Sequence, residues 1–419
     1  MEPAKIAVIG AGPGGAHFAS LAAAAGYRVL LFDPKGAWEK PCGGGVTSRG
    51  LKEYPFLTES QIHPYKSIDH LTVVSSEGRR VSVDLNYSFA VYSRAVLNDL
   101  IVKRAEAAGA RFIREKIIGF ERSSDGWALK DGSGGSWQTR LLVGADGAAS
   151  STRRHLIGIL PAQDIALAMG YNAFCRSEGV SGRLRRPKRG PDQSNTVVVQ
   201  FLKNFSGYLW AFPRLNCINF GIASKLREQT SSALRTTLDD FVSGHLNDSG
   251  LSAERSDFFA AKIPVLDRGS WKDLKVSGDG WALIGDAAGF VDPITGEGIY
   301  YALKSADLLF SSLPKDGSAG PVGEVTDTDA GREALDSARF SASYEALWRR
   351  TFGQELERAS KLLRRFYGSR FMGRDFNDAM VLLARYHPGI RNTMTRAIVG
   401  EQSYVSLKRD LVRSLFRPF

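Results

Sequence analysis

Residues 6–15 read Ile6-Ala7-Val8-Ile9-Gly10-Ala11-Gly12-Pro13-Gly14-Gly15, an apolar run that passes into the spacing G-x-G-x-x-G. A second apolar run, Arg28–Phe32, ends at an acidic residue, Asp33. This order predicts a strand over Lys5–Ile9, a helix over Gly14–Ala25 and a second strand over Arg28–Phe32. A βαβ unit with these glycines is typical of a dinucleotide-binding site.

The residue types in this unit suit a bound dinucleotide. Gly10, Gly12, Gly14 and Gly15 permit a tight turn and let a pyrophosphate approach the free N–H groups at the start of the helix. Asp33 can accept hydrogen bonds from ribose hydroxyls. We therefore predict that these five residues bind the cofactor.

A thiol stands beside three consecutive glycines in Pro41-Cys42-Gly43-Gly44-Gly45, eight residues after Asp33. Glycine loses the most backbone entropy on folding, so such a run is kept either for flexibility or because something flat lies against bare backbone. Its place after the fingerprint favours the second interpretation and points to redox chemistry on a flavin. Cys42, Gly43 and Gly44 are predicted to contact the cofactor, and Cys42 is either a participant in catalysis or a small packed residue.

A second glycine-rich turn follows a predicted strand at Trp281–Ile284. It contains Gly285-Asp286 and continues to Gly296, Gly298 and Ile299, where a helix is expected to begin. The Asp286 carboxylate can hold a ribose or ribityl hydroxyl, and N–H groups at a helix start can face an anionic ring edge. Two such sites more than 250 residues apart in the sequence fit an extended dinucleotide, which FAD is.

The rest of the sequence divides into three parts with different predicted secondary structure. The first part also predicts a hairpin over residues 67–85, a helix over Arg94–Gly109 and strands over Phe112–Phe120, Trp127–Lys130 and Leu141–Val143. Several β-rich segments lie between Ile165 and Lys262 and suggest an antiparallel sheet. Residues 182–194 read as an exposed loop, residues 311–331 as a linker, and residues 333–417 as mostly helical.

Composition excludes some classes of protein. Only three cysteines occur in 419 residues, with no Cys/His cluster, which argues for a reducing compartment and against a structural zinc site. No apolar run is long enough to span a bilayer. Of the net charge of +11, about +8 lies in the last 80 residues, from 15 Lys+Arg against 7 Asp+Glu. This basic end is a solvated helical face or a surface for anionic lipid or a phosphorylated substrate, and no nucleic-acid-binding motif accompanies it.

Together these motifs resemble the p-hydroxybenzoate hydroxylase fold group of flavoproteins, which covers hydroxylases, halogenases and prenyl reductases. The resemblance spans residues 1–305 and includes the segment Leu142-Val143-Gly144-Ala145-Asp146-Gly147 with Ser150 and Arg153 behind it. It implies that Asp146 and Arg94 contact FAD and that the backbone near Ile117 borders the adenine.

Two features resemble the geranylgeranyl reductases within this group. One is the cysteine-glycine loop, and the other is Gly207-Tyr208-Leu209-Trp210-Ala211-Phe212-Pro213, which is similar to the segment that lines the substrate cavity in that family. Tyr208, Trp210 and Phe212 alternate, so they share one side of a strand, either as ordinary core or as a cavity wall. The resemblance favours the wall, and these three residues are the predicted substrate contacts.

We therefore expect an α/β protein built from a Rossmann-like FAD-binding domain, an inserted antiparallel-sheet substrate domain and a C-terminal helical region. The predicted divisions are: residues 1–66, 90–164 and 271–310 for the FAD-binding domain, 67–89 and 165–270 for the substrate domain, 311–332 for the linker, and 333–419 for the helical region.

The expected activity is reduction of C=C bonds in an isoprenoid or similarly long apolar substrate, with hydride from the flavin N5 and a proton from an acid for which Cys42 is the candidate. The alternative is a flavin-dependent monooxygenase or halogenase acting on an aromatic or carrier-bound substrate. Because no second fingerprint is present, the electron donor, NAD(P)H or reduced ferredoxin, is expected to bind transiently. A cytoplasmic protein is expected, with peripheral membrane association through the basic C-terminal helices.

Overall fold

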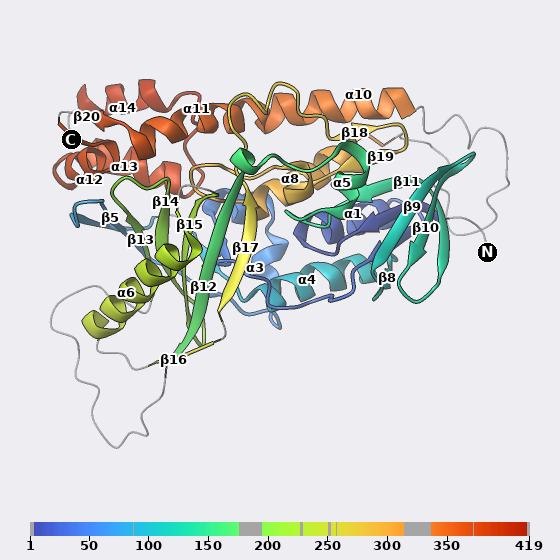
Figure 1. Cartoon of the computed structure of the whole chain (residues 1–419), viewed down its shortest axis with the longest axis horizontal. Helices are drawn as coiled ribbons and strands as arrows, with labels where there is room; N and C mark the ends of the chain where they lie inside the picture. The colour runs from blue at the N-terminus through green and yellow to red at the C-terminus, as the bar shows by residue number, and fades with distance from the viewer. Residues whose placement is uncertain are drawn as a thin grey trace, which may run out of the picture.

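The computed structural model contains two large β-sheets and a set of C-terminal helices that lies along both (Figure 1). It describes residues 4–86, 88–175, 195–226, 229–249, 253–256, 258–313, 337–371 and 373–416. The predicted loop over residues 182–194 and nearly all of the predicted linker therefore lie outside the described residues.

The first sheet is built around the βαβ unit that the sequence predicts. Its strands follow the order β18-β19-β11-β1-β2-β8, and β1, β2, β8, β11 and β19 run parallel. Its strands are β1 (Ala4–Ile9), β2 (Val29–Phe32), β8 (Arg111–Ile113), β9 (Ile117–Ser123), β10 (Gly126–Asp131), β11 (Ser136–Gly144), β18 (Ser277–Gly278) and β19 (Trp281–Leu283). The predicted strand Phe112–Phe120 is thus two strands, because the chain turns after Ile113 to enter the antiparallel β9–β10 pair.

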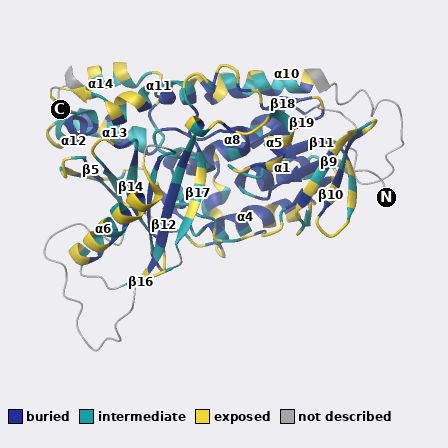
Figure 2. Cartoon of the chain, in the orientation of Figure 1, coloured by how far each residue is buried: buried dark blue, intermediate teal, exposed yellow. Residues whose placement is uncertain are grey.

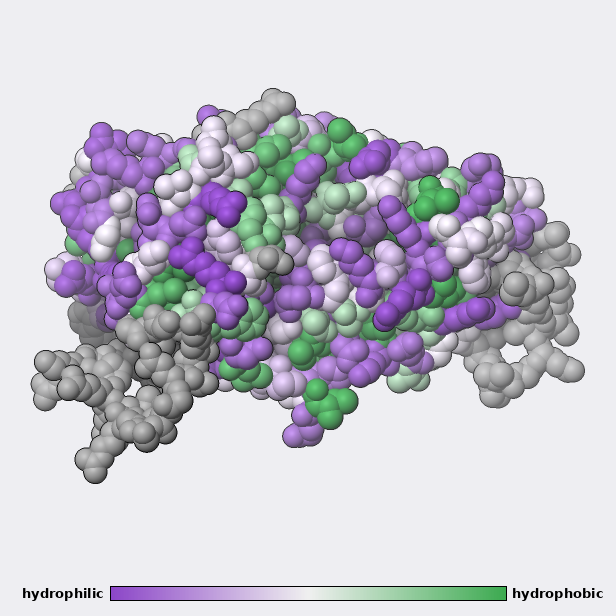
Figure 3. All heavy atoms as spheres, turned by 60° about the horizontal axis from the view of Figure 1, so that its bottom comes forward, coloured by the Kyte–Doolittle hydropathy of each residue, from purple (hydrophilic) through white to green (hydrophobic). Residues whose placement is uncertain are grey.

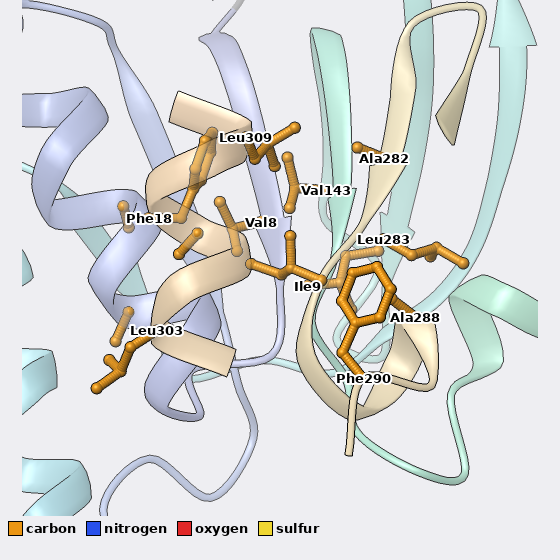
Figure 4. Close-up of a cluster of buried hydrophobic side chains, with 14 of the residues drawn as sticks. Val8, Ile9, Phe18, Val143, Ala282, Leu283, Ala288, Phe290, Leu303 and Leu309 are labelled. Atoms are coloured by element: carbon orange, nitrogen blue, oxygen red, sulfur yellow. The ribbon is translucent and has the colours of Figure 1, made fainter. Parts of the chain in front are cut away.

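Helices cover this sheet and complete its core. Helix α1 (Pro13–Ala24) packs against α4 (Arg94–Ala107) and α8 (Ile299–Ser311). Phe18 of α1 and Leu309 of α8 lie near Val8 of β1 (Figure 4), and these three side chains and that of Leu303 are buried. Figure 2 shows that burial is most continuous around α1, β11 and α8. This packing holds the carboxyl ends of the parallel strands, and the glycine-rich turns that follow them, in fixed positions.

The second sheet has the order β16-β12-β15-β14-β13-β5-β6, and β17 also pairs with β12. All its pairs are antiparallel except β5–β13, which is parallel and joins the early hairpin to the later strands. Its strands are β5 (His70–Val74), β6 (Arg80–Asp84), β12 (Ile165–Cys175), β13 (Thr196–Phe201), β14 (Gly207–Pro213), β15 (Ile218–Lys225), β16 (Ala253–Arg255) and β17 (Phe259–Pro264).

Helix α6 (Ser231–Ser249) covers one face of this sheet and was not predicted from the sequence. Its buried residues Leu234, Leu238, Val242 and Leu246 recur every four positions, which places them on one face of a helix. The other face of the sheet is turned toward the C-terminal helices.

The end of the chain is helical as predicted, apart from a short hairpin. The helices are α10 (Ser337–Trp348), a π-helical turn (Arg349–Gly353), α11 (Gln354–Gly368), α12 (Phe376–Tyr386), α13 (Pro388–Ile398) and α14 (Leu407–Phe416). The hairpin joins β20 (Arg370–Phe371) to β21 (Arg374–Asp375). Shorter elements complete the chain: α2 (Ser48–Glu53), α3 (Phe56–Glu59), α5 (Ser151–Ile157), α7 (Gly285–Ala288), and a small sheet of β3 (Gly45–Val46), β7 (Ala90–Val91) and β4 (Lys66–Ser67).

A buried carboxylate fastens the C-terminal helices to the second sheet. Asp378 of α12 has a fully buried side chain, and Arg79 Nη1 donates to both of its oxygens at 2.6 and 2.7 Å. Ser75 Oγ donates to Asp378 Oδ1 at 2.7 Å. Burial raises the pKa of this carboxyl, but the hydrogen bonds from Ser75 and Arg79 outweigh that effect, so the pKa lies below its usual range.

Replacing Asp378 with asparagine is expected to lower the free energy of unfolding at pH 7 by about 3 kcal/mol, because it leaves a partly buried arginine without its partner. The unfolded state binds the proton more readily than the folded state, so the contribution of Asp378 is full above the ordinary aspartate pKa of about 4 and is lost as the pH falls below it. Urea unfolding at several pH values tests this. A constant difference between wild type and Asp378→Asn down to pH 3 would contradict it, and the exposed Asp125→Asn is the control.

Candidate active site

The glycines of the fingerprint leave the start of α1 open. Gly10 has φ +104°, and a Cβ there would lie 2.4 Å from the carbonyl oxygen of Ala145 at the end of β11. A Cβ on Gly15 would lie 1.9 Å from the carbonyl oxygen of Gly10. Gly12, which precedes α1, has no atom within 4 Å of such a Cβ. Gly10 and Gly15 are therefore required for packing, while Gly12 borders open space at the helix N-terminus, where an anion is favoured.

A cavity of about 850 Å³ begins at this helix N-terminus. It passes the cysteine-glycine loop and continues between the second sheet and helices α11–α14. It brings together most of the residues predicted from the sequence. These are Gly12, Gly14, Gly15, Cys42, Gly43, Gly44, Arg94, Tyr208, Trp210, Phe212, Asp286, Gly296, Gly298 and Ile299.

Four predicted residues do not line the cavity: Gly10, Asp33, Ile117 and Asp146. Asp33 lies at the end of β2, where its carboxylate accepts N–H groups of Ala11, Lys35 and Gly36 at 2.8–3.0 Å. Asp33 is half-buried, so its remaining lone pairs are accessible to a ligand. Its predicted contact with a ribose stays a prediction.

Asp146 and Ile117 both make contacts within the protein. Asp146 accepts backbone N–H groups from Ser151 and Thr152 at 2.8 and 3.0 Å and so caps the start of α5. The Ile117 side chain is buried in the core of the first sheet, which leaves only its backbone to border an adenine. Their predicted cofactor contacts also remain untested predictions.

Arg94 is the strongest sign that an anion binds near the fingerprint. Its side chain is 4% exposed, yet no ion pair joins it to any described carboxylate. One hydrogen bond, from Nη2 to Asn98 Oδ1 at 3.2 Å, holds the guanidinium, and Nε is buried with no partner. A buried guanidinium in this state is costly unless an anionic group completes its hydrogen bonds. The diphosphate-bearing FAD fits this requirement.

Asp286 faces the same part of the cavity from α7. It lies 3.5 Å from Lys40 Nζ, and both side chains are partly exposed. Lys40 directly precedes the cysteine-glycine loop and was not predicted as a site residue. The pair joins the two glycine-rich segments across the cavity, and it leaves the Asp286 oxygens able to accept a hydroxyl of the cofactor.

The cysteine-glycine loop lies against the aromatic strand β14. A Cβ on Gly43 would lie 2.9 Å from the Phe212 ring, and a Cβ on Gly45 would lie 3.0 Å from the rings of Phe212 and Phe89. On the side where a Cβ would stand, these two glycines accommodate aromatic side chains of the protein itself, and the predicted cofactor contact of Gly43 stays a prediction. Gly44, with φ +82°, instead accommodates the carbonyl oxygen of Tyr92, 2.1 Å from where its Cβ would be.

Cys42 lies half-buried in the cavity wall beside this contact. Its Sγ accepts the N–H of Gly44 at 3.3 Å, and its carbonyl oxygen accepts Arg214 Nη2 at 2.8 Å. Arg214 also pairs with Glu39 at 2.7 Å. Both ends of the loop are therefore held, and the thiol hydrogen remains available to the cavity.

The alternation of residues along β14 separates two environments. Tyr208, Trp210 and Phe212 line the cavity, while Leu209 and Ala211 belong to the core beneath α6. Trp210 Nε1 donates to Asn219 Oδ1 at 2.8 Å, which fixes the indole ring across Gly221. The three aromatic residues thus form a wall in fixed orientations.

Two buried acids, Asp292 and Glu297, lie near this wall and were not predicted as site residues. Glu297 lines the cavity and accepts Thr47 Oγ1 at 2.5 Å and Arg49 Nη2 at 2.8 Å. Burial raises the pKa of Glu297, and the charge of Arg49 opposes the rise. Arg49 could not be assigned from sequence because it lies 248 positions from Glu297 and belongs to no recognised motif.

Tyrosine hydroxyls hold the loop that carries these acids. Tyr208 donates to the carbonyl oxygen of Thr295, and Tyr367 to that of Ile294 at 3.0 Å. The Tyr404 hydroxyl hydrogen-bonds instead to the carboxyl of Asp292, whose pKa burial raises above its usual range. Because Tyr404 lines the cavity and Asp292 does not, this hydroxyl is the contact between the buried carboxyl and the cavity.

The wall opposite β14 comes from the C-terminal helices, which also escaped prediction as site elements. Its apolar members include Leu362, Leu363, Phe366, Met380, Leu383, Ile390, Met394, Ile398 and Leu411. The Phe366 ring lies 5.1 Å from that of Phe201 on β13. The amphipathic pattern of α11 was the available signal, but it does not say what the apolar face covers.

A dinucleotide-type helix N-terminus, beside a buried arginine that no described carboxylate pairs with and continuous with a long apolar cavity, is typical of an FAD-dependent oxidoreductase. No family model matches the chain. Among curated relatives, it is 30% identical to menaquinone reductase from Mycobacterium tuberculosis over 333 residues, 74% of this chain and 77% of the relative. It is 28% identical to geranylgeranyl diphosphate reductase from Rhodobacter capsulatus over 70% of this chain and 71% of that relative. It is 28% identical to digeranylgeranylglycerophospholipid reductase 2 from Methanothermobacter thermautotrophicus over 85% of this chain and 86% of that relative.

Solved structures agree on the fold. A geranylgeranyl bacteriochlorophyll reductase-like protein from Thermoplasma acidophilum superimposes with a TM-score of 0.75 at 19% identity, covering 99% of this chain and all of that one. The flavin-dependent brominase Bmp2 gives a TM-score of 0.66 at 15% identity, covering 98% of both chains. At such identities these two show the fold alone. With the sequence relatives, they establish that the chain belongs to the geranylgeranyl reductase family of FAD-dependent oxidoreductases.

Proposed function

We propose that this enzyme saturates C=C bonds in an isoprenoid chain. The observation that carries the proposal is the continuity of one cavity from the start of α1 to the apolar space between β14 and α11–α14. An extended prenyl chain gains about 0.8 kcal/mol per methylene that it buries, so such a cavity favours long substrates. When bound, reduced FAD supplies hydride from N5.

The protein's own contribution is to orient the alkene and to deliver the second hydrogen as a proton. An isolated alkene is unpolarised, so a proton donor in a water-poor wall is needed. Trp210 and Phe212 offer flat apolar surfaces for the chain, and the Cys42 thiol and the Tyr404 hydroxyl are two proton-bearing groups in the wall.

Anaerobic turnover tests this function directly. Protein reduced with dithionite and mixed with geranylgeranyl compounds is expected to give products heavier by 2 mass units per bond reduced, in step with flavin reoxidation. Reoxidation only when oxygen is admitted, with oxygenated or halogenated product, would favour the monooxygenase or halogenase alternative, to which the brominase-like fold alone points.

Cys42 is proposed as the proton donor or as the residue that closes the cavity beside it. Cys42→Ala is expected to lower alkene reduction at least tenfold while FAD stays bound, because general-acid catalysis typically contributes a hundredfold or more. Cys42→Ser retains a hydroxyl donor and should recover part of the rate. Full turnover in both variants would remove Cys42 from the chemistry, and Tyr404→Phe would then be the variant expected to lose the rate.

The electron donor is proposed to be NAD(P)H or reduced ferredoxin, which would bind transiently. Stopped-flow reduction of the enzyme-bound flavin by each donor separates them. A donor is excluded if the flavin is reduced no faster in its presence than in a control without any donor.

We also propose that the C-terminal helices meet a membrane surface peripherally. Val405, Val412 and Phe371 are exposed apolar side chains at this end, and Lys408 and Arg413 lie on α14. Within the described residues, no helix is both long and apolar enough to cross a bilayer. Figure 3 shows one face of the molecule, where hydrophilic and hydrophobic side chains are interspersed. Co-sedimentation with anionic vesicles that disappears in high salt would support this contact, whereas its absence at low salt would contradict it.

A further inference from the structure

Arg214 is a buried arginine at the end of the aromatic strand. It directly follows Pro213, the last residue of β14, and its backbone N–H donates to the carbonyl oxygen of Cys217 at 2.8 Å. This hydrogen bond closes the turn that joins β14 to β15, so the backbone of Arg214 is fixed to the aromatic wall. The Arg214 side chain is 4% exposed and does not line the cavity, so it lies outside the surface that a substrate can touch.

The guanidinium of Arg214 joins two residues that precede it by 172 and 175 positions in the sequence. Nη2 donates to the carbonyl oxygen of Cys42 at 2.8 Å, and Nη1 donates to Glu39 Oε1 at 2.7 Å. The planar fork of an arginine makes two such hydrogen bonds at once in a fixed geometry, which the ammonium group of a lysine does not. The peptide that carries the thiol is therefore held by a charge-assisted hydrogen bond.

Glu39 connects the same guanidinium to the start of α4. Its carboxylate accepts Ser93 Oγ at 2.5 Å and the backbone N–H of Arg94 at 3.1 Å. Burial raises the pKa of Glu39, but the charge of Arg214 and the hydrogen bond from Ser93 outweigh that effect, so the pKa lies below its usual range. The pair of Glu39 and Arg214 is therefore charged at neutral pH.

These contacts fix three parts of the candidate active site relative to one another. Strand β14 carries the aromatic wall, the cysteine-glycine loop carries the thiol, and α4 begins with Arg94, the predicted contact to FAD. Arg214 binds the carbonyl oxygen of Cys42 itself, so a shift of this peptide would move the thiol with it. A displacement of about 1 Å at a reacting group can lower a rate about a hundredfold.

We propose that Arg214 positions the Cys42 thiol between the aromatic wall and the FAD site. It acts through the loop and touches no substrate, so it is a positioning residue and not a catalytic one. The inference rests on the proposed function, in which Cys42 gives the proton or closes the cavity.

Alkylation of Cys42 in the FAD-loaded protein tests the position of the thiol without any turnover. Iodoacetamide is the probe, and mass spectrometry of the peptide that contains Cys42 separates this thiol from Cys175 and Cys217. Arg214→Met should raise the alkylation rate about threefold or more, because the loop loses its anchor and the half-buried thiol becomes more accessible. Arg214→Lys, which keeps the charge without the fork, should lie between wild type and Arg214→Met.

Arg349→Met is the matched control. Arg349 also donates to backbone carbonyl oxygens, those of Trp271 and Leu274, but it does not line the cavity and has no contact with the loop. Its replacement should leave the alkylation of Cys42 at the wild-type rate. An unchanged rate in Arg214→Met, or an equal rise in Arg349→Met, would overturn the proposal. Arg214→Gln serves the same purpose if Arg214→Met does not fold.

Turnover gives the second readout. Arg214→Met is expected to lower kcat for alkene reduction about tenfold to a hundredfold and to leave KM nearly unchanged, because Arg214 does not reach the cavity. In the Cys42→Ala background the same change should have no further effect, since residues that act as a unit are not additive. An equal loss in both backgrounds would overturn the proposal, because Arg214 would then act by another route.

The two readouts separate a failure of this inference from a failure of the proposed function. If wild type reduces no alkene, the reductase function fails, while the alkylation rates still decide whether Arg214 positions the thiol. If the alkylation rates change as expected but Cys42→Ala keeps full turnover, the positioning by Arg214 stands and the thiol has no part in the reaction.

Discussion

The substitution Gly44→Ala is expected to release FAD and to lower the free energy of unfolding substantially. Gly44 has φ +82°, and a Cβ there would lie 2.1 Å from the backbone oxygen of Tyr92, which cannot move aside like a side chain. The left-handed conformation alone costs about 1–2 kcal/mol for a residue with a Cβ. Together with the clash, we expect a loss of at least ~3 kcal/mol and release of FAD, because the displaced loop lines the cofactor cavity.

The control for Gly44→Ala is available in the same chain. Gly78 has a similar φ of +78°, but no atom lies within 4 Å of its added Cβ. Thermal unfolding and the flavin absorbance of each purified variant are the measurements. If Gly78→Ala proved as destabilising as Gly44→Ala, the clash with Tyr92 would not be the cause.

Replacement of Arg94 by methionine is expected to separate cofactor affinity from stability. In the protein without FAD, the buried guanidinium lacks a carboxylate partner, so removing its charge should leave the thermal unfolding temperature unchanged or raise it. In the FAD-bound protein the same change removes charge-assisted hydrogen bonds worth about 1.5–3 kcal/mol each. FAD affinity is therefore expected to fall about tenfold to a hundredfold or more.

Fluorescence titration of FAD and the unfolding temperature of the FAD-free protein are the two measurements for Arg94→Met. Arg104→Met serves as the control, since Arg104 lies on the same helix, is exposed and stacks on the Phe56 ring. Equal destabilisation of the FAD-free and FAD-bound forms would mean that Arg94 supports packing rather than the cofactor.

The parts of the fold that could be predicted are those that depend only on short stretches of sequence. The fingerprint of residues 6–15 needs only its own turn and helix, so the βαβ unit follows from it directly. The alternation of Tyr208, Trp210 and Phe212 likewise places them on one side of a strand. Helix α6 also left a local signal in its four-residue spacing of apolar side chains, which the β-rich interpretation of that region passed over.

The unpredictable parts depend on partners distant in sequence. The contact of Gly43 with an aromatic ring depends on Phe212, and the charge that compensates Glu297 comes from Arg49, 248 positions away. The hydrogen bonds from the start of α5 to Asp146 could not be predicted from its motif either, and its predicted cofactor contact stays a prediction. A sequence motif shows which contacts a residue is able to make, and the packing of the folded chain decides which of them it makes.

The cavity is lined by residues near α1, which come early in the sequence, and by helices α11–α14, which come late. Synthesis runs at about 5–20 residues per second, so the first sheet leaves the ribosome before helices α11–α14. During that interval the aromatic face of β14 has no covering wall. The flavin site and the hydrophobic tunnel are consequently completed at different moments of biosynthesis, with the tunnel sealed last.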